Sequence, residues 1–174
     1  LGLLTPLSAA VTLLIGGWWM ATPIVLLLGL YPFLDALAGS STVHDVEEEG
    51  KGHNVIVHLH GILVPVVVIC LLYRVSIGVG SVSIIVPTLS AGLATGASGV
   101  VAAHELCHRR IRSNSWWLGR LDLLCVLYLH FTVEHNHTHH KHWARKVDPT
   151  SSPWGRSVYG LSLIHISEPT RPYW

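Results

Sequence analysis

Charged residues are scarce in this chain. Asp, Glu, Lys and Arg together make up 12% of its 174 residues, whereas a soluble globular domain carries about 25%. Hydrophobic residues make up 50% and the mean hydropathy is +0.48. These values exclude an intrinsically disordered chain and argue against a water-soluble globule. The formal net charge is only +1, so the sequence lacks the strongly basic surface that favours binding to nucleic acid.

Methionine and cysteine are also rare. Met20 is the only methionine, and the chain opens inside an apolar run with no basic segment of the kind that begins a signal peptide. Cys70, Cys107 and Cys125 are an odd number of thiols in apolar or helical surroundings. They predict buried thiols rather than a disulfide framework, and the chain contains no iron–sulfur motif.

Long apolar runs, by contrast, fill the first two thirds of the sequence. A helix of about 20 apolar residues crosses a bilayer, so the runs predict about four transmembrane helices in an all-α membrane bundle. The predicted spans are a truncated first one before a tight turn near 16–22, a second ending near Leu37, a third at 54–73 and a fourth at 81–103. The acidic residues 39–53 predict a loop, and the Gly, Ala and Ser residues of the fourth span favour close helix packing.

Histidine is the residue that the chain has in excess. Its 13 histidines outnumber both the 10 acidic residues and the 11 Lys and Arg residues. Most of them follow residue 103, where the chain also becomes more positively charged. Because imidazole is the commonest metal ligand in proteins, the sequence predicts a metal site beside the membrane.

The first histidine box is H-E-L-C-H, from His104 to His108. Its two histidines are four residues apart, which places both imidazoles on one face of a helix. The pattern by itself is ambiguous, because H-E-x-x-H is also the motif of zinc metalloproteases.

The second box is E-H-N-H-T-H-H, from Glu134 to His140. His135 and His139 again share a helix face at a spacing of four, and His140 is placed to reach a second ion. Histidine together with carboxylate is also the ligand chemistry of non-haem iron. Two boxes of this kind predict a site for more than one metal ion.

Residues 116–133 lie between the boxes and mix apolar residues with Arg120, Asp122 and His130. This mixture predicts an amphipathic helix at the membrane surface, because one helix of this length cannot cross the bilayer and return. Both boxes then lie on one side of the membrane. Of the Lys and Arg residues before 161, nine fall on that side and only Arg74 on the other, so the boxes are expected in the cytoplasm.

His58 and His60 lie two residues apart near the start of the third span. An ionisable group within a membrane span is a functional candidate. Since the two side chains face different sides of a helix, we expect them at the interface or in helix–helix hydrogen bonds.

The two boxes and their spacing of about 26 residues resemble the membrane alkane 1-monooxygenases, which belong with the fatty acid desaturases and hydroxylases. The segments Leu34–Gly39 and Asp148–Tyr159 are also similar to that family. The resemblance covers 1–160, as the N-terminal part of a partial desaturase-like or hydroxylase-like membrane domain. It implies a di-iron enzyme (Fe²⁺/Fe³⁺) that hydroxylates an alkane or another hydrophobic chain with O₂, using electrons from a rubredoxin-like or ferredoxin-like donor.

The same resemblance implies which residues act. The implied iron ligands are His104, His108, His135, His139 and His140. Glu105, Glu134 and Asn136 are expected beside these ligands, where they would orient the imidazoles. His137 falls on a variable position of the family's box and receives no ligand role, and Thr138 replaces the usual glycine.

The two ends of the chain carry separate expectations. Residues 161–174 resemble the translation of a sequencing adapter and are expected to be an artefact. The family's later histidine boxes do not occur in this sequence. We therefore expect activity from a longer parent protein and an inactive chain in isolation.

Three alternatives remain open at this stage. A fatty acyl desaturase is the nearest, because the same iron chemistry can remove two hydrogens. An intramembrane zinc metalloprotease would use Glu105 as its base, but it would leave the second box unexplained. A metal-binding membrane protein without enzymatic activity would place ionisable ligands inside its spans, and 81–103 holds none.

Overall fold

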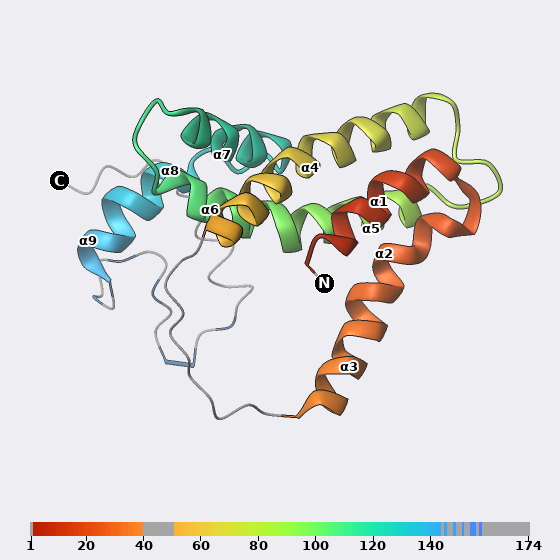
Figure 1. The fold of residues 1–174 in the computed structure, drawn as a ribbon, viewed down its shortest axis with the longest axis horizontal. Coiled ribbons are helices and arrows are strands. Elements are labelled where there is room, and N and C mark those ends of the chain that lie inside the picture. Colours follow the sequence, from red (N-terminus) through yellow and green to blue (C-terminus); the bar gives the residue numbers. More distant parts are fainter. Residues whose placement is uncertain are drawn as a thin grey trace. The chain divides into compact units, whose positions relative to one another are not determined.

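The computed structural model describes residues 2–39, 51–143 and six further positions, Arg145, Asp148, Ser151, Trp154, Gly155 and Ser157. Every regular element within these residues is helical (Figure 1). The chain divides into two compact units, Leu1–Leu127 and Tyr128–Trp174. Most of the acidic loop predicted at 39–53 and the predicted artefact at 161–174 lie outside the described residues.

The first unit begins with α1 (Leu4–Ile15), whose 12 residues are shorter than a bilayer span, as the truncated first run predicts. The chain then reverses at Gly16 and Gly17, which have φ values of +84° and +62°. Glycine adopts these values without the steric cost that a side chain would incur. The reversal is therefore tighter than the turn expected near 16–22, and helix resumes at Gly17.

The second span runs from Gly17 to Ala38 as four consecutive helical segments. They are η1 (Gly17–Ala21), α2 (Thr22–Val25), the π-helical η2 (Leu26–Leu30) and α3 (Tyr31–Ala38). Pro23 and Pro32 each stand in the first turn of an α-helical segment. A proline in the first turn of a helix has a suitable φ, and the N–H that it lacks would have no acceptor within the helix there. The helical run therefore continues through both prolines.

Two longer helical runs complete the spans. They are α4 (Lys51–Ser76), and the continuous run of α5 (Ile85–Thr95), η3 (Gly96–Val100) and α6 (Val101–Cys107). The first extends beyond the predicted 54–73 at both ends, whereas the second begins and ends later than the predicted 81–103. The first box therefore lies in the last turn of a span. Among the described residues, three helical runs are thus long and apolar enough to cross a membrane, which confirms a helical membrane bundle.

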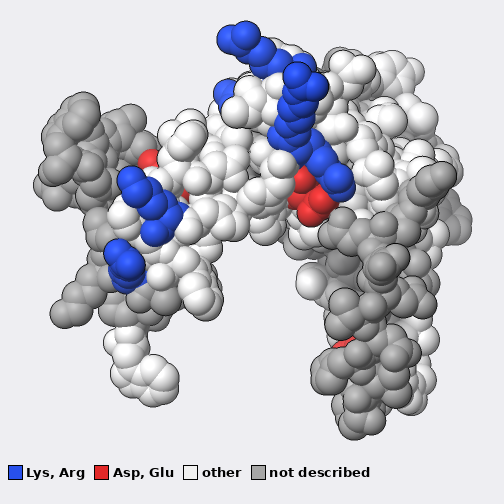
Figure 2. Space-filling view, turned by 60° about the vertical axis from the view of Figure 1, so that its left-hand side comes forward, with Lys and Arg blue, Asp and Glu red and all other residues white. Residues whose placement is uncertain are grey.

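Apolar side chains on these spans are widely exposed. Leu28, Ile69, Ile85 and Val101 each keep between 64% and 68% of their surface exposed. Figure 2 likewise shows a surface that is mostly uncharged, with Lys and Arg gathered in a few small groups. Contiguous apolar surface of this kind is unfavourable in water and suits contact with lipid, so the chain is an integral membrane protein.

The core of the first unit lies where α1, α4 and α5 run side by side (Figure 1). It is built largely from small residues, because alanines from α1 and α5 pack against Val67 and Cys70 of α4. Gly99 of η3 continues this contact, since a Cβ atom there would lie 2.9 Å from Val64. The predicted close approach of residues 81–103 is confirmed. None of the three cysteines forms a disulfide within the described residues; Cys70 and Cys107 are buried as predicted, whereas Cys125 is only partly buried.

Helix α7 (Asn114–Cys125) packs against α6 and α4. Ser113 begins it by accepting a hydrogen bond from the backbone N–H of Trp116 at 3.2 Å. A Cβ atom at Gly119 would lie 2.9 Å from Leu106, so the glycine allows α7 to approach α6 closely. The helix expected over 116–133 ends at Cys125, because Leu127 adopts a φ of +56°, which an α-helix cannot include.

The described part of the second unit contains one short helical run. It consists of α8 (Phe131–Val133), the π-helical η4 (Glu134–His139) and α9 (His140–His142). This run carries the second box.

Arg74, near the end of α4, holds the end of α1 in place. Its guanidinium donates one hydrogen bond to the Leu13 carbonyl at 2.6 Å and a second to the Leu14 carbonyl. Replacing Arg74 by methionine leaves both carbonyls without this donor, so we expect a loss of about 1–3 kcal/mol of stability. Thermal unfolding in detergent measures the effect, with the exposed Arg110→Met as the matched control. Equal midpoints for the two variants would contradict this role.

Candidate metal centre

The first box lies at the end of α6, the last part of the helical run Ile85–Cys107. Ala102, Ala103 and Leu106 of α6 are buried, whereas His104 and His108 on its opposite side are exposed. The two imidazole rings lie 5.1 Å apart between centroids. The expected pairing at a spacing of four is therefore confirmed, and both rings can reach one ion.

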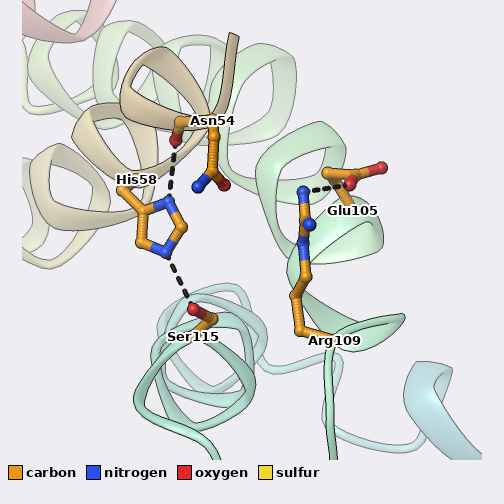
Figure 3. A network of polar contacts seen from close by, with 5 residues as sticks. All are labelled: Asn54, His58, Glu105, Arg109 and Ser115. Atoms are coloured by element: carbon orange, nitrogen blue, oxygen red, sulfur yellow. Dashed lines mark hydrogen bonds and ion pairs between the residues drawn. The ribbon is translucent and has the colours of Figure 1, made fainter. Parts of the chain in front are cut away.

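Glu105 faces a different partner. Its carboxylate accepts a hydrogen bond from the Arg109 guanidinium at 2.7 Å, as an ion pair across one helical turn (Figure 3). This pair lies on the same end of α6 as the two histidines. The expected role of Glu105 in orienting the imidazoles stays a prediction.

His58 joins α4 to α7. Because a carbonyl can only accept, the Nδ1–H of His58 donates to the Asn54 carbonyl at 2.7 Å. In the neutral ring Nε2 then accepts from the Ser115 hydroxyl at 2.8 Å (Figure 3). The prediction of a helix–helix hydrogen bond is confirmed for His58, which fixes α7 beside α4.

The second box lies on a π-helical segment. The expected sharing of one face by His135 and His139 is confirmed, because their rings stack with centroids 5.4 Å apart. Residues 134–139 form a π-helix, in which backbone hydrogen bonds join residues five apart. His135 consequently pairs with His140, and their Nε2 atoms lie 3.0 Å apart. The His135 ring is buried and stacks on Phe131, with centroids 4.8 Å apart, so the pair is built on an immobilised ring.

This geometry fits a bound metal ion. Two nitrogens that each bind one ion at about 2.1 Å, with bond angles of 90–109°, lie about 3.0–3.4 Å apart. The Nε2 atoms of His135 and His140 fall at this separation. Neutral imidazole pairs of this kind suit iron, copper, nickel or zinc.

His139 turns toward Asp148 instead. Its Nδ1–H donates to a carboxylate oxygen of Asp148 at 2.9 Å, and the Asp148 side chain is completely buried. The ring also lies beside His135, with centroids 5.4 Å apart. Sequence analysis assigned no role to Asp148. The only signal was its place in the segment that resembles the family, nine residues beyond His139.

Glu134 and Asn136 flank His135 within η4. Burial raises the pKa of the nearby Tyr128 hydroxyl, and the charge of Glu134 raises it further. The expected roles of Glu134 and Asn136 beside the ligands stay predictions.

An apolar cavity of about 400 Å³ leads to the first box. Its walls come from Ile56 and Val57 of α4, from Ala97 of η3 and from Val101 of α6. It ends at His104 and Glu105, and His53 and His60 also line it. The cavity therefore lies between membrane-spanning helices and beside a candidate metal ligand.

Comparison with known proteins places these features in a family context. The chain is 28% identical over 170 residues to alkane 1-monooxygenase 1 of Alcanivorax borkumensis. It is 31% identical over 153 residues to alkane 1-monooxygenase 1 of Pseudomonas aeruginosa, and 30% identical over 171 residues to the alkane 1-monooxygenase of Pseudomonas putida. These alignments cover 91%, 82% and 91% of this chain.

The same alignments cover 41%, 39% and 41% of the three relatives. The chain thus spans about two fifths of the length of the curated proteins it matches. No protein-family model matches it.

Proposed function

Because this chain belongs to the alkane 1-monooxygenase family over the part of those proteins that it spans, we propose that the whole protein hydroxylates an alkane or a similar hydrophobic chain with O₂. In this proposal the chain contributes the first two histidine boxes of a di-iron centre. The support comes from the sequence identity, from the paired imidazoles of each box and from the apolar cavity.

Five histidines would hold the irons. These are His104, His108, His135, His139 and His140. When bound, the iron pair supplies the activation of O₂ that an unactivated C–H bond requires. The protein's own contribution is to fix the imidazoles, to deliver the substrate and to exclude water.

The cavity that ends at His104 is the observation that carries the proposal. An alkane has no polar group to anchor it, so it binds only through apolar contact and shape. The walls from α4, η3 and α6 supply that contact. Because the cavity lies between membrane helices, a substrate dissolved in the bilayer can enter it without crossing water.

The proposed orientation places the boxes on the cytoplasmic side of a multi-pass inner or plasma membrane. Nine Lys and Arg residues before 161 lie on this side and Arg74 on the other, as expected for cytoplasmic loops. In this proposal the electrons come from a rubredoxin-like or ferredoxin-like donor, as the family resemblance implies.

Isotope labelling tests the reaction. Membranes that contain the whole protein, the electron donor and an alkane are incubated under ¹⁸O₂, and the products are analysed by mass spectrometry. The proposal predicts a 1-alkanol that carries ¹⁸O. An alkene from an acyl chain without new oxygen would indicate a desaturase, and an alcohol with oxygen from water would contradict a monooxygenase.

The cavity predicts how substrate length is limited. Ala97→Leu adds three carbon atoms to the wall contributed by η3. We expect at least a tenfold loss of activity on the longest accepted alkanes and a smaller loss on short ones, because only the long chains need the space that is filled. Product yields across a series of alkane lengths measure this shift.

Ala36→Leu, on the exposed side of α3 and away from the cavity, is the matched control. An equal loss at every length for Ala97→Leu would show that the cavity is not the binding site.

A further inference from the structure

Asp148 is a buried acid held by two hydrogen bonds. One oxygen of its carboxylate accepts from the His139 Nδ1–H at 2.9 Å and from the Ser151 hydroxyl at 2.5 Å. Its side chain is completely buried, while the His139 side chain keeps 24% of its surface exposed. Burying a carboxylate is costly unless it is paired, so these hydrogen bonds compensate for the burial of Asp148.

Two backbone hydrogen bonds join Asp148 to described residues on either side of it. The Asp148 N–H donates to the Arg145 carbonyl at 3.0 Å, and the Ser151 N–H donates to the Asp148 carbonyl at 3.2 Å. Asp148 therefore sits between two consecutive turns. Its side chain reaches back over nine residues of sequence to His139.

The hydrogen bond to Asp148 also determines which tautomer of the His139 ring is favoured. A neutral imidazole carries its proton on one nitrogen and a lone pair on the other. Because the carboxylate accepts from Nδ1–H, it favours the tautomer whose Nε2 carries the lone pair. An acid placed in this way fixes both the tautomer and the orientation of a metal-binding histidine.

We propose that Asp148 is a positioning residue that presents the Nε2 lone pair of His139 to the metal centre, with Ser151 holding the carboxylate in place. The proposal rests on the ligand role of His139 in the proposed function. His135 and His140 already hold each other through Nε2 contact. His139 is contacted by an acid from outside the box, Asp148.

Two measurements test this role. The first is the tautomer of His139, read from the ¹⁵N shifts of its ring in the metal-free whole protein and assigned with His139→Gln. We expect the Nδ1–H tautomer to dominate, and Asp148→Leu to convert most of it to the Nε2–H form. Asp148→Asn keeps an oxygen that can accept, so we expect it to retain a larger share of the Nδ1–H form.

The second measurement is the affinity for Fe²⁺ under anaerobic conditions. We expect Asp148→Leu to weaken it about 10- to 100-fold and Asp148→Asn to weaken it less. Ser151→Ala keeps the carboxylate and is expected to lose less than about threefold. Circular dichroism identifies any variant that fails to fold, and Asp148→Asn is the variant to rely on if Asp148→Leu does not fold.

The outcomes separate the two hypotheses. If His139 keeps its Nδ1–H tautomer in a folded Asp148→Leu variant, or if Fe²⁺ affinity is unchanged in both Asp148 variants, the positioning role is overturned. A whole protein that binds no Fe²⁺, in which the tautomer still depends on Asp148, would overturn the di-iron proposal instead.

Discussion

Replacing His135 by alanine is expected to lower the iron content of the whole protein at least tenfold and to abolish hydroxylation. His135 is the buried ring of the second box, it stacks on Phe131, and its Nε2 lies 3.0 Å from that of His140. Its loss removes one of the proposed ligands and also the contact that places His140. Iron quantification on purified protein, alongside activity in membranes, measures both effects.

His137→Ala is the matched control within the same box. Its side chain is exposed, and it stands two residues from His135 on the same π-helical segment. We expect its iron content to stay within about twofold of the unaltered protein, because surface substitutions away from structural contacts have small effects. Equal losses for the two variants would mean that the box binds metal only as a histidine-rich segment without specific geometry.

Asp122 is expected to make the folded protein less stable as the pH rises from about 4 to 8. Its side chain is fully buried, and neither carboxylate oxygen has a hydrogen-bonding partner among the described residues. One oxygen lies against Gly61 of α4, where a Cβ atom would approach it to 3.0 Å. Burial raises the pKa of the Asp122 carboxyl from 3.8 to about 8.

The sign of the effect follows from proton binding. Between these two pKa values the folded protein holds the Asp122 proton, while the unfolded chain has released it. The stability contributed by Asp122 is therefore complete below about pH 4 and is lost as the pH rises through about 8. The loss amounts to at most about 1.4 kcal/mol per pH unit.

Asp122→Asn removes this titration. Since asparagine is neutral at every pH, we expect the variant to unfold at a higher temperature than the unaltered protein at pH 8, and the difference to shrink toward pH 4. Thermal unfolding in detergent across this range measures the trend. Asp35→Asn, on the exposed side of α3, is the control, and a parallel trend in the two variants would contradict a buried acid at Asp122.

Much of the fold was predictable from hydropathy, because lipid selects for long apolar helices whatever their packing. The spans that became Gly52–Ser76 and Ile85–Cys107 follow directly from this pattern. Their bounds were less predictable, since polar residues such as His53 and Asn54 continue a helix once its hydrogen-bonding ladder is established. The end of α7 at Cys125 depends on the backbone of Leu127, which no residue type in that segment indicates.

The contacts of the candidate site were likewise only partly predictable from the sequence. The pairing of His104 with His108 was predictable, because an α-helix brings residues four apart together. The pairing of His135 with His140 was not, because it depends on a π-helical register that residue spacing does not reveal. The contact of Asp148 with His139 depends on two turns in the chain beyond the box, and the pattern of histidines carries no information about them.

The most direct test of the central claim is Mössbauer spectroscopy of the whole protein, prepared with ⁵⁷Fe and combined with total metal analysis. The account predicts two irons per protein that form one coupled pair, and it predicts that His104→Ala and His135→Ala each remove the signal of the pair. Zinc as the only bound metal would contradict the account. So would iron that is held by one box and remains unaffected when the other box is altered.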